Sequence, residues 1–188
     1  MAIWQFNIYF IPRKSLLNKY GQVPTQLVMD NKKRWNDYIE NSDLEEEPSF
    51  EDALTIHWWL DLNISLDNLS PLLKSFGDIQ SWTQNTKGLR SYGDTEANDI
   101  SVCFDNITNI VEEVSCRLDL RYLDKSFIDK VLSLAIQFDC LLMDAQGGLY
   151  QPALTALFDT IKLSNAYRFV GDPEQFLNDL SKGIVTPE

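Results

Sequence analysis

The chain has 188 residues, of which 44% are apolar and 12% aromatic, enough to form one hydrophobic core without disulfides or a structural metal. Its formal charge is −12, its pI is near 4.4, and no stripe of Lys and Arg interrupts the acidity. A surface of this sign repels phosphate backbones and anionic lipids. We therefore expect neither a nucleic acid nor a membrane among the partners.

No targeting or anchoring segment is predicted. No stretch approaches the about 18 continuous apolar residues of a membrane-spanning helix. The opening residues IWQFNIYFI include polar Gln5 and Asn7 and lack a basic leader. The cysteines at 103, 116 and 140 are scattered and form no CxxC pair, which is typical of reduced thiols. These features predict a cytoplasmic protein.

The first strand is predicted at residues 2–11, where apolar Phe6, Ile8 and Phe10 alternate with polar neighbours until Pro12 removes a backbone donor. Residues 13–20 are short and basic without a clear period, and residues 26–29 fit a second brief strand.

Helical spacing at Trp35 and Ile39 predicts a helix over residues 31–40. Eight acids and no base then fall between Asp37 and Asp52. Such a run is usually a solvated connection, and the alternative is an acidic surface for a basic partner.

Two segments follow that carry different periods. Residues 56–64 alternate apolar and polar side chains, so we favour a strand, although a helix also fits behind the cap-like Ser49-x-x-Asp52. Residues 66–76 place leucines at helical spacing and predict a helix that ends at Gly77. Residues 78–97 are polar and read as a long connection.

The centre of the chain, residues 98–122, predicts two strands. Ile100, Val102 and Phe104 alternate with polar residues, and the same period returns from Cys116 to Tyr122. The alternation places Cys103 on the outer face and Cys116 on the core face, so we expect no disulfide between them.

The C-terminal third predicts helices around one more strand. Residues 126–138 carry one apolar stripe behind a cap-like Ser126-x-x-Asp129. Residues 140–143 form a short apolar strand. A helix follows Pro152 to about residue 165, and a last one begins at Asp172-Pro173 and ends at Gly183.

Catalytic and metal motifs are scarce. His57 is the single histidine, and the chain has no HExxH, no glycine-rich nucleotide loop and no Asp-rich calcium loop. For His57 we favour a structural or surface role over catalysis. Glu112 and Glu113 are neighbours, so their side chains should diverge into solvent. We expect no metal and no cofactor.

One constellation could bind a ligand. Arg117, Asp119 and Arg121 share one face of a strand, and spare guanidinium donors could hold a carboxylate or phosphate. The alternative is an ion network on the sheet surface that involves Asp105 or helix acids. Pocket walls for such a ligand would come from the polar connection, at Trp82, Arg90 and Tyr92.

The sequence thus predicts one α+β domain over residues 1–188, with an antiparallel or mixed sheet of about five strands and helices on at least one face. The expected role is non-catalytic binding of a basic protein, in the manner of small inhibitor or immunity proteins. The alternative is an anion-binding protein or enzyme that uses the Arg117, Asp119 and Arg121 cluster.

Overall fold

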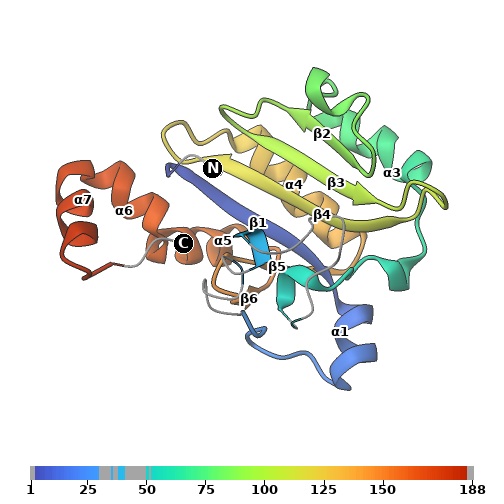
Figure 1. Cartoon of the computed structure of the whole chain (residues 1–188), viewed down its shortest axis with the longest axis horizontal. Coiled ribbons are helices and arrows are strands. Elements are labelled where there is room, and N and C mark those ends of the chain that lie inside the picture. Colours follow the sequence, from blue (N-terminus) through green and yellow to red (C-terminus); the bar gives the residue numbers. More distant parts are fainter. Residues whose placement is uncertain (1–2, 30–34, 36–37, 41–49, 51, 186–188) are drawn as a thin grey trace.

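The computed structural model describes residues 3–29, 35, 38–40, 50 and 52–185 (Figure 1). They form one six-stranded antiparallel sheet in the order β2-β3-β4-β1-β5-β6. The strands are β1 (Gln5–Pro12), β2 (Leu89–Gly93), β3 (Asp99–Phe104), β4 (Val111–Asp119), β5 (Cys140–Met143) and β6 (Leu149–Tyr150). The predicted α+β class is confirmed, with one strand more than expected.

Six α-helices with complete bounds among the described residues accompany the sheet. They are α1 (Arg13–Tyr20), α3 (Leu66–Leu73), α4 (Lys125–Gln137), α5 (Leu154–Leu163), α6 (Asn165–Gly171) and α7 (Pro173–Ser181). Short 3-10 turns lie at Ala53–Thr55, Leu60–Leu62, Lys74–Phe76 and Ser81–Thr83. Among the described residues, no helix is both long enough and apolar enough to cross a membrane.

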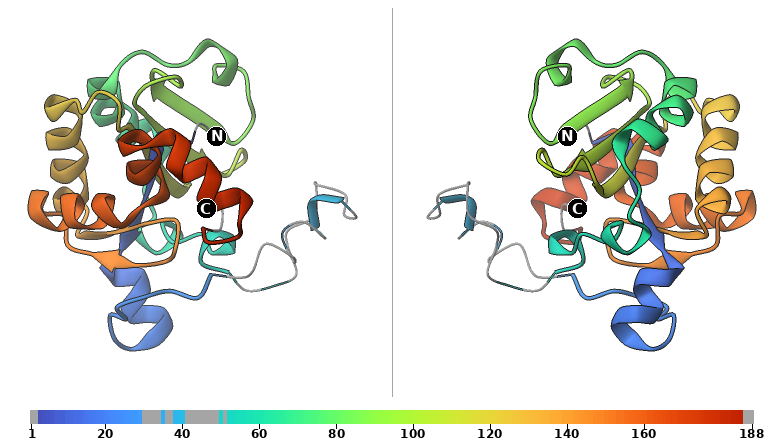
Figure 2. Two further views of the ribbon diagram at one scale, coloured as in Figure 1. Left: turned by 90° about the vertical axis from the view of Figure 1, so that its left-hand side faces the viewer. Right: turned by 90° about the vertical axis from the view of Figure 1, so that its right-hand side faces the viewer.

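Helices α3, α4 and α5 cover one face of the sheet, which we call the core face. In Figure 1 the strands lie in front of α4, and Figure 2 shows α4 and α5 on one side of the sheet. Alternate strand residues meet the apolar stripes of these helices. Buried members include Phe6, Ile8, Phe10, Ile100, Val102, Cys116, Leu69, Leu73, Phe127, Val131, Leu134, Leu157 and Ile161.

The strongest predicted elements are confirmed. β1, β3, β4 and β5 match the expected strands, and α3, α4, α5 and α7 match the expected helices. Asp172 caps α7 with Pro173 at its first position, as predicted. The cap of α4 is different, because Asp124 rather than Ser126 accepts the N–H groups of Ser126 and Phe127, at 2.8 and 3.2 Å.

Residues 56–64 are not a strand. Trp58 and Trp59 are adjacent and both buried, which an alternating strand cannot achieve. Their indole N–H groups donate to the carbonyls of Ala53 and Phe10, at 2.7 and 2.8 Å. These bonds hold the segment in turns. Residues 26–29 are not a strand either; Gln26 forms an isolated bridge with Gly148.

Two elements were missed. Residues 13–20 form α1, which buries Leu16 and ends at Gly21 in the left-handed region. The expected polar connection 78–97 contains the edge strand β2, which ends at Gly93 with φ 99°. A Cβ on Gly77 would lie 2.8 Å from the Cα of Gly93, so two glycines allow this close crossing. The helix predicted for residues 31–40 and the acidic run of residues 37–52 lie mostly outside the described residues.

Candidate functional site

The other side of the sheet, which we call the outer face, carries rows of polar side chains from β1, β3 and β4. Antiparallel pairing places Asn7, Arg117 and Asp99 in one row and Tyr9, Ser115, Ser101 and Ser91 in the next. Glu113 and Cys103 form a third row. In Figure 1 this face looks toward the viewer, with no described helix drawn across β3 and β4.

These rows enclose a recess of about 210 Å³ on the outer face. The residues that line it, most of them with polar side chains, are Asn7, Tyr9, Asp99, Ser101, Glu113, Ser115, Cys116 and Arg117. Pockets for drug-sized molecules measure about 300–1,000 Å³. The recess is smaller than these and has the scale of one amino-acid side chain. We take it as the candidate functional site.

Asp99 and Arg117 form a closed ion pair at the edge of the recess. The Arg117 Nε donates to Asp99 Oδ1 at 2.7 Å, and its Nη2 donates to Oδ2. Asp99 is fully buried, and the Ser91 hydroxyl donates to it at 3.2 Å. Its hydrogen bond raises the pKa of Arg117 further, so that this guanidinium stays charged. The pair is therefore satisfied within the fold.

Arg121 and Asp119 form a second, separate pair. The Arg121 Nη2 donates to Asp119 at 2.7 Å and to the Glu96 carbonyl at 3.1 Å, and the guanidinium lies 4.3 Å from the Trp4 ring centre. Arg121 lowers the pKa of Asp119 by this hydrogen bond. The predicted three-residue cluster is thus divided, with Asp99 rather than Asp105 or a helix acid as the partner of Arg117.

The turn that joins β2 to β3 precedes Asp99, one of the residues that line the recess. Gln5 lies on β1 beside the Asn7 row, and its side-chain amide donates to the carbonyls of Thr95 and Ala97, at 3.0 and 2.9 Å. Asn98 accepts the Asp119 N–H at 2.8 Å. These bonds tie the turn to the ends of β1 and β4.

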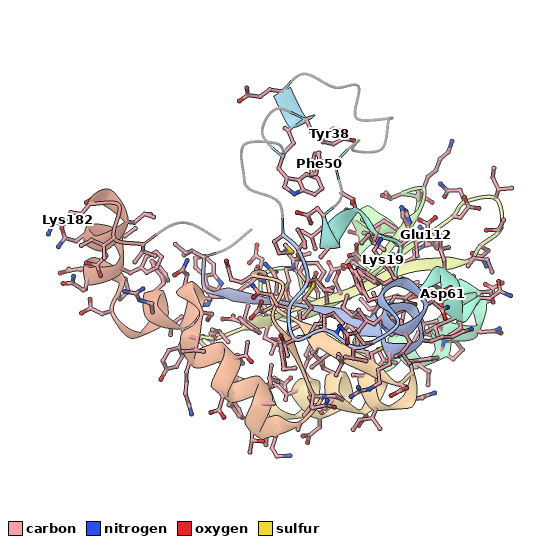
Figure 3. All side chains as sticks on the ribbon, turned by 90° about the horizontal axis from the view of Figure 1, so that it is seen from below. Lys19, Tyr38, Phe50, Asp61, Glu112 and Lys182 are labelled. Atoms are coloured by element: carbon pink, nitrogen blue, oxygen red, sulfur yellow. The ribbon has the colours of Figure 1, made fainter. Side chains whose placement is uncertain are left out.

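A bulge in β4 lies next to Glu113. The register shifts so that Cys103 faces Glu113 while Phe104 faces Val111, and the Glu112 carbonyl accepts the Trp59 N–H at 3.1 Å. His57 Nδ1 lies 3.4 Å from the Glu112 carboxylate. Figure 3 shows Glu112 on the side of the sheet away from α4 and α5. His57 therefore lies at the site's edge, in contact with an acid.

Glu113 is the charged group in the recess that the described structure leaves without a cationic partner. No Lys or Arg of the described residues lies within ion-pair distance of it. Burial raises the pKa of Glu113, while a hydrogen bond from Ser115 and the charge of His57 lower it in part. Glu113 is half-buried, so the expectation that it is fully solvated does not hold.

Two further groups around Glu113 are held neutral. Burial, followed by the charge of Glu113, raises the pKa of Tyr9 to about 12. Burial and the charges of Glu113 and Glu112 raise the pKa of the Cys103 thiol to about 12. Since the thiolate is the nucleophile of cysteine chemistry, Cys103 is unsuited to covalent catalysis at neutral pH.

The three predicted pocket walls do not line this recess. Tyr92 faces the core, fully buried, with its hydroxyl 2.7 Å from that of Ser70. Arg90 donates to the carbonyls of Thr83 and Thr86 and lies over Phe104, so it holds the loop before β2 closed. Trp82 is 54% exposed on that loop.

Sequence reasoning missed Glu113, Tyr9 and the serines of the recess. Tyr9 and Glu113 were available as outward residues of alternating strands, but their meeting depends on the register of β1, β3 and β4. Register between distant strands cannot be read from the period of a single strand.

A wider groove of about 690 Å³ lies between α3 and α4. It is lined by Leu72, Phe76 and Leu134 together with exposed polar residues.

No metal site emerges in the part of the chain that the structure describes, since no three His, Cys, Asp or Glu side chains gather there. What the recess offers is a carboxylate and several hydroxyl and amide oxygens, which recognise cations and hydrogen-bond donors.

Searches against family models, curated proteins and solved structures found no match for this chain. The site is therefore interpreted from its own geometry and electrostatics.

Proposed function

We propose that the chain is a non-catalytic binding domain for a basic protein, which it holds against the outer face of its sheet. The observation that supports this most is Glu113, a carboxylate in the recess without a Lys or Arg partner among the described residues. A formal charge of −12 adds long-range attraction for a positively charged partner. An inhibitor or immunity protein that neutralises a basic protein would have these properties.

The anion-binding alternative has weaker support. The Nε and Nη2 groups of Arg117 are used by Asp99, and the same groups of Arg121 are used by Asp119. The recess holds two carboxylates, Asp99 and Glu113, against the single guanidinium of Arg117. Its local charge therefore opposes an anionic ligand.

The proposal is tested by capturing partners from native lysate at low salt and measuring their association with the purified chain. We expect basic proteins, whose association rate falls steeply between low and physiological salt because screening removes steering. Stopped-flow mixing measures this rate. A flat salt response, or capture of acidic proteins alone, would contradict the proposal.

Matched variants locate the interface. Ser101→Lys adds a positive charge and a long side chain inside the recess, whereas Ser133→Lys makes the same change on the exposed side of α4. We expect the first variant to lose the captured partner and the second to keep it. Equal binding by both would show that the partner docks elsewhere, and circular dichroism would confirm that both variants fold.

A further inference from the structure

The recess has the size and the polarity to receive one cationic side chain. Its volume of about 210 Å³ is below the range of drug-sized ligand pockets, and most of its lining residues, from β1, β3 and β4, carry polar side chains. A side chain that projects from a partner would enter between these residues.

The oxygen atoms that line the recess suit a cation. Glu113 supplies a carboxylate, and Tyr9, Ser101 and Ser115 add hydroxyl oxygens. Both Asp99 oxygens already accept bonds from Arg117. A charged N–H donor would therefore find its strongest acceptor at Glu113, since charge-assisted bonds are about twice as strong as neutral ones.

The energetics favour the same occupant. An ionised carboxylate that is taken out of water is costly unless a cation or hydrogen bonds compensate it. In the described structure, Glu113 has the Ser115 hydroxyl and the more distant charge of His57 as compensation. A neutral ligand would bury Glu113 further without compensation, whereas an ammonium or guanidinium group would supply the missing charge.

We propose that a single lysine or arginine side chain of the partner inserts into the recess and pairs with Glu113. This inference rests on the proposed function and specifies the chemistry by which the outer face recognises its partner. Tyr9 and Ser115 act as positioning residues that direct the cationic group onto the carboxylate.

The test uses four blocked tripeptides with a central lysine, arginine, norleucine or citrulline, added to the folded chain. Norleucine and citrulline keep the approximate shape of the two basic side chains and remove the charge. Binding is followed through the side-chain carboxyl ¹³C resonance of Glu113. We expect the lysine or arginine peptide to shift this resonance and the neutral peptides to leave it in place.

Glu113→Gln is the matched variant, with Glu174→Gln as its control. Glu174 is exposed on α7, so the control removes the same charge far from the recess. For peptide binding measured by backbone amide shifts, we expect a loss of about tenfold or more in Glu113→Gln and none in Glu174→Gln. Equal binding of neutral and cationic peptides, or full binding by Glu113→Gln, would overturn the inference.

The outcome separates this inference from the proposed function. If the basic partner still associates in a salt-dependent manner and is lost only in Ser101→Lys, while Glu113→Gln binds normally, the outer face binds protein without the insertion. If no basic partner associates, both fail together. If the lysine and arginine peptides differ, the stronger one identifies the side chain that enters.

Discussion

The two faces of the sheet differ in the interactions that their side chains make. On the core face, apolar residues of β1, β3 and β4 pack with residues of α3, α4 and α5 in one buried cluster. On the outer face, the polar rows form their own ion pair and hydroxyl bonds around Asp99. Glu113 is the exception there, because no Lys or Arg of the described residues pairs with it.

This difference separates residues that stabilise the fold from residues that are available for binding. A group whose interactions are complete in the free chain contributes to stability, and its loss is measured by unfolding. A group whose charge is left uncompensated costs stability and becomes favourable only when a partner arrives, as is common at functional sites. The predictions below compare the two faces on this basis.

The largest effect is expected on the core face. Leu134 is 4% exposed on α4, so Leu134→Ala should lower the free energy of unfolding by about 2–5 kcal/mol through lost burial and a cavity. Ile136 lies two residues further along the same helix and is 64% exposed. Ile136→Ala should cost no more than about 0.5 kcal/mol. Urea unfolding of both variants checks this, and equal losses would mean that α4 does not face the sheet as described.

The next effect concerns the closed ion pair of the outer face. Arg117→Gln would leave the fully buried Asp99 without its counter-ion, which should cost about 3 kcal/mol of unfolding free energy. Arg121 is the more exposed of the two arginines, so Arg121→Gln should cost clearly less. Urea unfolding orders the two variants. A larger loss for Arg121→Gln would contradict the assignment of Arg117 as the structural arginine.

A smaller effect is expected at Glu113, where removal of the charge should raise the free energy of unfolding instead of lowering it. Its pKa is raised in the folded chain, so the folded state binds more protons than the unfolded state between the ordinary glutamate value of about 4.3 and the raised value. Stability should therefore fall as the pH rises through this window. Among the described residues, the charged groups Asp99 and Arg117 line the same recess as Glu113, and His57 acts on it electrostatically.

Glu113→Gln removes this cost. The variant should be more stable than the parent chain at neutral pH, and the two should converge below the ordinary pKa of glutamate. Thermal melts across this pH range measure the difference. If Glu113→Gln were instead less stable at neutral pH, the carboxylate would be compensated within the fold, and the contrast between the two faces would disappear.

The smallest effect concerns the cysteine thiols. Their rates of modification test which face of the sheet each cysteine occupies. Cys103 lies on the outer face and Cys116 on the core face, and all three cysteines are free. Because burial raises the pKa of the Cys103 thiol to about 12, little reactive thiolate forms at neutral pH. We expect slow alkylation of the native chain and three rapid modifications in denaturant, followed by mass spectrometry. A stable Cys103–Cys116 disulfide would refute the strand register.

Local patterns predicted most of the sheet and most of the helices, because alternation and helical spacing are properties of single segments. Residues 98–122 and residues 126–138 were correct for this reason. The strand predicted for residues 56–64 was wrong because two adjacent tryptophans are both buried. Each indole N–H donates to a backbone carbonyl, that of Ala53 for Trp58 and that of Phe10 for Trp59. The alternating pattern gave no sign of these bonds.

The candidate site was less predictable than the fold. Arg117 was recognised as a notable residue, but its partner Asp99 lies on the neighbouring strand and is set by register. Glu113 was taken for a solvated residue because the bulge that separates it from Glu112 is a property of the paired strands. Pairing between strands, and not the pattern within them, determines the outer face.

The most direct test of the account is a map of backbone amide shifts on addition of a lysine- or arginine-containing peptide to the parent chain. We predict that the shifted amides concentrate around Tyr9, Ser101, Glu113 and Ser115, and that Glu113→Gln loses this response. Shifts confined to the groove between α3 and α4, around Leu72 and Ser133, would contradict the outer face as the binding surface.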